Sequence, residues 1–144
     1  MNPFSKPFHE VNFDDVKEFC EQKYPESTTL DYKKDLPRDL AKHFATFSNT
    51  LGGTIIIGVE EDPDTGQPLK WDGISNDGKL IEHISQFAAN VIPLPSYIAR
   101  LTNEQNGKVF GLINIIEGDA QPYHANSDMR QSLELFAAST FSHD

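Results

Sequence analysis

Acidic side chains gather around two apolar segments of this chain. Glu26 precedes the first segment, Asp31 lies within it, and Glu60 and Glu61 directly follow the second, residues 54–59. If the two segments are neighbouring strands, three of these acids can converge at one end of a sheet. Three carboxylates with lysines nearby suit a hard divalent cation and a phosphodiester substrate. Because 22 of the 144 residues are Asp or Glu, acids scattered without a function are the alternative.

The densest basic stretch of the sequence lies between these acidic positions. It contains Lys33, Lys34, Arg38 and Lys42, interspersed with two aspartates that offset half of its charge. In a helix whose first turn includes Lys34, three of these residues, Lys34, Arg38 and Lys42, share one side and can contact phosphates. A solvated helix face is the alternative.

Apolar periodicity predicts the elements that position these residues. Apolar residues spaced by three and four predict helices over residues 14–23, 36–51 and 76–91. Alternating or continuous β-branched segments predict strands over residues 30–33, 54–59, 97–102 and 108–117, and the pair Asn106-Gly107 is typical of a hairpin between the last two. The five histidines show no metal-ligand spacing. Two of them, His43 and His83, are expected on the solvent-facing sides of their helices.

The order of these elements predicts one α+β domain in which helices pack on a mixed sheet. Pro3 and Pro7 discourage regular structure, so residues 1–12 are expected to form an N-terminal arm ahead of a domain at residues 13–144. Residues 118–127 have the composition of a loop. For residues 133–140, a helix and a final strand both stay open.

Composition and charge exclude several classes of protein. A chain of 144 residues with 38% hydrophobic residues can bury a core and is too apolar for a disordered protein. The formal charge of −10 opposes unselective binding of nucleic acid, so any contact with phosphates must be local. The single cysteine, Cys20, permits no intramolecular disulfide, and the first residues lack the apolar segment of a secretory signal. A cytoplasmic protein that does not enter a membrane is therefore expected.

Several motifs together resemble one protein family. Residues 26–33 (ESTTLDYK), 45–53 (ATFSNTLGG) and 57–61 (IGVEE) are similar, in order and spacing, to three motifs of the Schlafen-type AlbA-like domain. Residues 93–97 resemble its proline-rich step after the second helix, and residues 117–123 resemble its strand exit and P-Y turn. The resemblance covers residues 20–125 and implies the α+β fold of that family.

The resemblance also implies functions. Domains of this family are described as DNA-binding modules, and a related core in animal Schlafen proteins cleaves structured RNA with three metal-binding carboxylates. Those carboxylates correspond here to Glu26, Asp31 and Glu61, which would hold Mg²⁺ or Mn²⁺. Asp31 and Glu61 each differ by one methylene from the commoner residue, to which metal geometry is sensitive. The terminal arginine and glycine of the family are replaced by Leu135 and Ala137.

Three functions follow as hypotheses. The first is binding of DNA or RNA through Lys33, Lys34, Arg38 and Lys42, and the second is a metal-dependent endoribonuclease. The third is a domain that has kept the fold and binds a protein instead, which the charge of −10 and the missing arginine favour. Salt-dependent retention of nucleic acid distinguishes the first function from the third.

Overall fold

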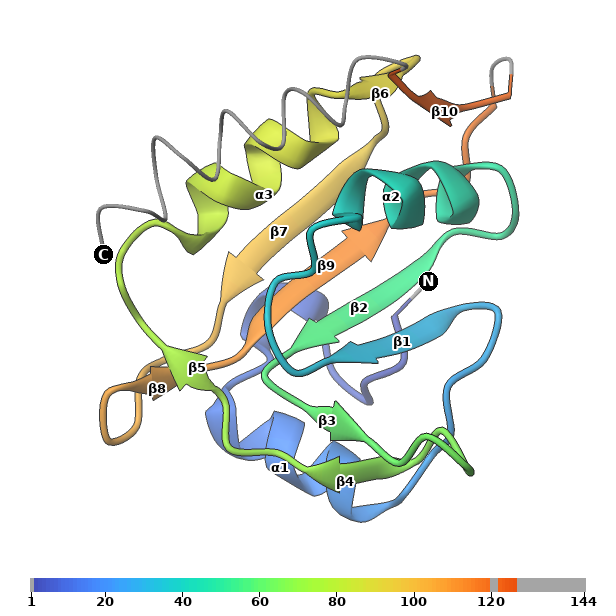
Figure 1. The fold of residues 1–144 in the computed structure, drawn as a ribbon. Helices are drawn as coiled ribbons and strands as arrows, with labels where there is room; N and C mark the ends of the chain where they lie inside the picture. The colour runs from blue at the N-terminus through green and yellow to red at the C-terminus, as the bar shows by residue number, and fades with distance from the viewer. Residues whose placement is uncertain (1, 120–121, 127–144) are drawn as a thin grey trace.

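The alternating and β-branched segments form a central sheet of four strands (Figure 1). In the computed structural model, which describes residues 2–119 and 122–126, the strand order is β1-β2-β9-β7. The strands are β1 (Leu30–Lys33), β2 (Gly53–Ile57), β9 (Gly111–Ile115) and β7 (Tyr97–Leu101). β1 and β2 run parallel, whereas β9 is antiparallel to both β2 and β7. The predicted α+β class with a mixed sheet is therefore confirmed.

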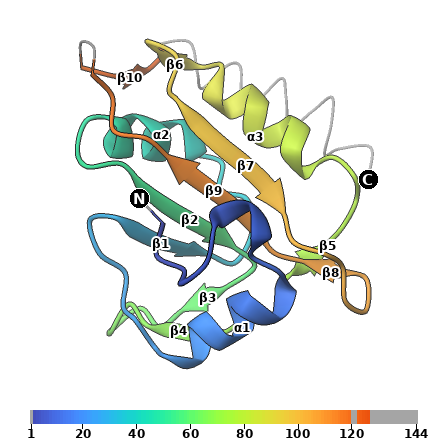
Figure 2. The same ribbon diagram turned by 180° about the vertical axis from the view of Figure 1, so that it is seen from behind.

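Helices cover both faces of this sheet. α2 (Leu40–Ser48) and α3 (Leu80–Ala88) lie on one face, and α1 (Phe13–Glu21) lies on the other (Figures 1 and 2). Ile55 and Ile57 of β2 belong to the core under α2 and α3, while Ile56 belongs to the core under α1. All of β2 is buried, because a strand with helices on both faces exposes neither.

The predicted helix over residues 36–51 is too long at both ends. α2 spans only Leu40–Ser48, because residues 34–39 connect β1 in the sheet to the helical layer above it. After the helix, Gly52 adopts φ +75°, and a Cβ at this position would lie 2.5 Å from the carbonyl oxygen of Ile115. A glycine is therefore required where the chain turns into β2. The predicted helix over residues 76–91 is likewise shortened to α3.

Three short two-stranded sheets surround the central one. They pair β3 (Glu60–Glu61) with β4 (Pro68–Lys70), β5 (Ile74–Ser75) with β8 (Lys108–Val109), and β6 (Val91–Ile92) with β10 (His124–Ala125). The predicted loop over residues 118–127 thus contains a strand. The predicted Asn106-Gly107 turn is confirmed, since both residues have positive φ, +53° and +77°, as a tight hairpin requires.

Residues 2–12 pack against the domain. Phe4 and Val11 are buried in the core under α1, and a 3-10 helix spans Phe8–Glu10. Nη1 of Arg100 in β7 donates hydrogen bonds to the carbonyl oxygens of Phe8 and Val11, at 3.1 and 2.6 Å. The tail with the alternatives of helix and strand, residues 133–140, lies outside the described residues. None of the described helices is long and apolar enough to span a bilayer.

Candidate functional site

The three predicted acids approach one another at the outer edge of β1. Asp31 lies in β1, Glu26 precedes this strand, and Glu61 lies in β3, which follows β2. Oε2 of Glu26 accepts a hydrogen bond from the backbone N–H of Tyr32 at 2.9 Å. The backbone N–H of Glu26 donates to the carbonyl oxygen of Gly66 at 2.9 Å. Glu26 is thus held between β1 and the turn that joins β3 to β4.

The carboxyl groups of this cluster interact directly. The Glu26 carboxyl lies near the carboxyls of Asp31 and Glu61, and both neighbours affect its pKa. Burial, and next the neighbouring Glu26, raise the pKa of Asp31 from 3.8 to about 7. Burial also raises the pKa of Glu26. Burial disfavours the charged form, and two neighbouring negative charges repel each other, so both effects favour the protonated form of Asp31.

Two basic side chains face the same carboxylate. Nζ of Lys33 and Nδ1 of His43 each lie 3.5 Å from Oδ2 of Asp31. The other ring nitrogen of His43 lies 3.4 Å from Oδ1 of Asp39. The prediction that His83 faces solvent is wrong, because His83 is 3% exposed, whereas His43 is partly exposed and lies between two acids. The sequence spacing could have indicated that His83 is buried. His83 follows Leu80 by three residues, which places both side chains on the inner face of α3.

The predicted basic stripe does not form. α2 begins at Leu40, so Lys34 and Arg38 lie in the connection from β1, and only Lys42 is helical. All three side chains are exposed. Lys34 has an acidic neighbour, with its Nζ 3.7 Å from Oε1 of Glu60. The connection therefore presents separate exposed cations near the acidic cluster instead of one continuous row.

A bound Mg²⁺ or Mn²⁺ would need oxygen atoms directed at a common point. Glu26, Asp31 and Glu61 supply oxygens of the suitable type. Within residues 2–119 and 122–126, however, no group of three His, Cys, Asp or Glu side chains is arranged to hold a metal ion. The three residues do not fit a metal in this arrangement, and the metal site stays a prediction.

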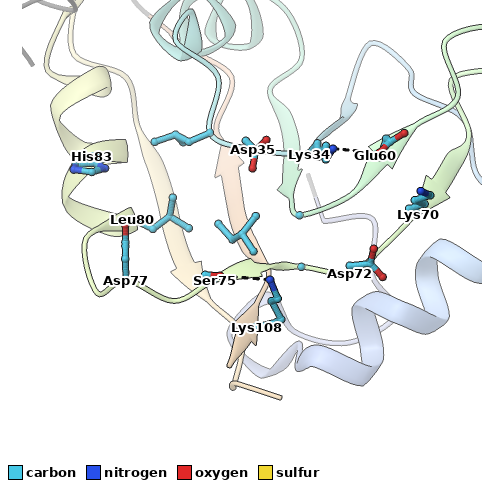
Figure 3. Close-up of a pocket in the computed structure, with 14 residues that line it drawn as sticks. Lys34, Asp35, Glu60, Lys70, Asp72, Ser75, Asp77, Leu80, His83 and Lys108 are labelled. Carbon is cyan, nitrogen blue, oxygen red and sulfur yellow. Dashed lines mark hydrogen bonds and ion pairs between the residues drawn. The ribbon is translucent and has the colours of Figure 1, made fainter. Parts of the chain in front are cut away.

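A cavity of about 590 Å³ opens beside Lys34 and Glu60, and none of Glu26, Asp31 and Glu61 lines it (Figure 3). Lys34 and Glu60 lie on one side of it, and Lys70 and Lys108 line it from β4 and β8. These two lysines were not among the predicted site residues. No local motif could identify them, because two different hairpins bring them together.

The comparisons with known proteins agree with this architecture. None of the curated proteins compared with the chain matches it. The family model described as Schlafen, AlbA_2 matches residues 26–134, which include the three acids together with β1, α2, β2 and β9. The matched region covers most of the chain and all the strands of the central sheet. The chain therefore belongs to the Schlafen AlbA_2 family.

Proposed function

We propose that this domain binds nucleic acid through a local positive surface. The observation that carries the proposal is the family match over residues 26–134. The geometry supports it, since Lys34, Arg38 and Lys42 are all exposed on the connection after β1 and the start of α2. Lysine and arginine side chains bind phosphates mainly by releasing the counterions that surround a nucleic acid.

The formal charge of −10 determines how this binding must behave. The overall field of the protein repels a polyanion, so contact has to be made where cations are locally in excess. Binding should therefore be detectable at low ionic strength and decrease steeply as salt is added. We expect the weakening between about 0.05 and 0.2 M salt to follow the number of phosphates contacted.

The test is fluorescence anisotropy with labelled RNA, single-stranded DNA and duplex DNA. The double variant Arg38→Gln/Lys42→Gln should weaken binding and lower the slope of log K against log salt by about 0.7 per lost contact for single strands. Lys79→Gln is the matched control, because Lys79 is exposed at the start of α3. Absence of binding to all three ligands at low salt would refute the proposal. Retention of one specific protein in their place would support the protein-binding alternative.

The second candidate function is an endoribonuclease. It is favoured by one observation, the contact of Glu26 with both Asp31 and Glu61. Because their present arrangement does not fit a metal, the three carboxyls would have to rearrange, and Asp31 would have to lose its proton, before acting as ligands.

Incubation with tRNA tests this second function. Cleavage should require Mn²⁺ or Mg²⁺, stop with a chelator, and be lost in Glu26→Gln, which keeps an acceptor for the N–H of Tyr32. Glu82→Gln, at an exposed position of α3, should leave cleavage unchanged. Cleavage that is equal in wild type and Glu26→Gln would indicate a contaminating nuclease.

A further inference from the structure

A second basic surface lies between α1, the end of β4 and the β8 hairpin. Lys17, Lys70 and Lys108 line a cavity of about 550 Å³ there, together with Trp71. Lys17 comes from α1, Lys70 ends β4, and Lys108 begins β8. None of these residues belongs to the acidic cluster or to the connection after β1.

The lysines of this surface differ from Lys33 and Lys34 in their neighbours. Lys33 and Lys34 each lie within 4 Å of a carboxylate. Within the described part of the chain, Lys17, Lys70 and Lys108 form no ion pair. Nζ of Lys108 has only the hydroxyl of Ser75 at 3.4 Å.

The local charge is therefore positive in a chain whose total charge is −10. Among the described residues that line this cavity, Asp72 is the one acid, so three lysines against one aspartate leave two positive charges. Figure 3 shows Lys70 and Lys108 with Asp72 between them. Because the negative charge of the whole protein repels phosphates, a phosphate can bind only where unpaired cations are locally in excess.

Trp71 adds an aromatic surface to the same cavity. Its ring is half-buried against the core under α1. Nζ of Lys23 lies 4.7 Å from the ring centroid and also donates a hydrogen bond to the carbonyl oxygen of Pro68, at 3.0 Å. Lys23 thus helps to fix the position of the ring, and Trp71 also lines the cavity. An aromatic ring beside unpaired lysines is the combination that proteins use to bind bases and phosphates of single strands.

We propose that this cavity binds single-stranded nucleic acid, with phosphates on Lys17, Lys70 and Lys108 and a base stacked on Trp71. This inference rests on the proposed function and specifies its ligand. A duplex keeps its bases stacked on one another, so only an unpaired base can reach a ring that lines a cavity. An acidic peptide would contact the lysines but has no planar base for the ring.

The same surface continues into the larger cavity. Lys70, Asp72 and Lys108 line both this cavity and the larger one beside Lys34 and Glu60 (Figure 3). A strand bound at Trp71 can therefore continue past these lysines to Lys34.

Trp71 is the only tryptophan in the chain, so fluorescence excited selectively from tryptophan reports on the surroundings of this one ring. We would titrate the full chain with a short oligouridine and follow tryptophan emission, with anisotropy of the labelled oligouridine measured in parallel. We expect saturable quenching that weakens between about 0.05 and 0.2 M salt. The double variant Lys70→Gln/Lys108→Gln should lower the slope of log K against log salt by about 1.4, at about 0.7 per lost contact. Lys79→Gln should behave like the wild type.

Each result has a defined meaning. Quenching that requires Lys70 and Lys108 supports the inference. Binding by anisotropy with unchanged tryptophan emission overturns it and leaves the proposed function standing. No binding of any nucleic acid refutes both. Equal quenching by duplex RNA, or by polyglutamate that also displaces oligouridine, overturns the assignment of a single-stranded ligand.

Discussion

Protonation of Asp31 couples the acidic cluster to the stability of the fold. Burial and the neighbouring Glu26 raise the pKa of Asp31 from 3.8 to about 7. The folded protein therefore keeps this proton at pH values where the unfolded chain has lost it. The resulting stabilisation is complete below the unfolded pKa and is lost as the pH rises through the folded one. The shift, about 3 pKa units, corresponds to a free energy on the order of 4 kcal/mol.

Asp31→Asn removes this titration and keeps a side chain of similar shape that can donate to Glu26. As the pH rises, the wild type should lose stability relative to the variant. From about pH 5 to pH 8, the difference in free energy of unfolding between the two should change by about 3 kcal/mol, because about two pH units of this window lie below the folded pKa. Urea denaturation of both proteins at several pH values measures this difference directly.

A matched control separates this effect from general titration of acids. Asp35→Asn removes an exposed aspartate on the connection after β1, outside the acidic cluster, and measures the effect of removing a carboxyl elsewhere on the surface. A difference between wild type and Asp31→Asn that does not vary with pH would contradict the raised pKa. A wild type that gains stability over the variant as the pH rises would show that Lys33 and His43 dominate, and would refute the reasoning.

Three further substitutions test contacts that hold the fold together. Gly52→Ala places a Cβ 2.5 Å from a carbonyl oxygen of β9, whereas Gly78→Ala at φ +77° meets nothing within 4 Å. The first should lower the free energy of unfolding in urea by about 2 kcal/mol more than the second, and equal values would contradict the predicted clash. Arg100→Ala removes two hydrogen bonds to the N-terminal segment, so amide exchange over residues 4–11 should accelerate about tenfold, and unchanged exchange would show that these bonds do not hold the segment. Asn49→Ala leaves the backbone N–H and carbonyl of Tyr123 without their side-chain partner and should cost about 1–3 kcal/mol, measured as a lower Tm.

Local patterns were sufficient to predict the core of the fold. The β-branched residues of β2 indicate a strand buried on both faces, and the structure has helices on both faces there. The alternation of β1 places Leu30 and Tyr32 inside, and leaves Asp31 on the opposite face. The pairing of β1 with β2 meets the condition under which the sequence predicted that three acids could converge.

Features that depend on connections between elements were not predictable in the same way. The first turn of α2 was placed too early, because periodicity does not reveal that residues 34–39 cross between layers. The contact of His43 with Asp31 depends on how α2 lies over β1. The basic cavity has the same origin, because Lys17, Lys70 and Lys108 come from three elements that no local motif connects.

The outer edge of β1 has a consequence for aggregation. The backbone groups of Leu30 exchange hydrogen bonds with Ser27, and the N–H of Tyr32 is bonded to Glu26. A free edge strand is a template on which a second chain can add its own strand. Glu26 therefore blocks intermolecular strand pairing at this position in addition to its place among the acids. An alanine substitution here would open that edge, so a loss of activity would report self-association together with lost chemistry, whereas Glu26→Gln keeps the edge closed.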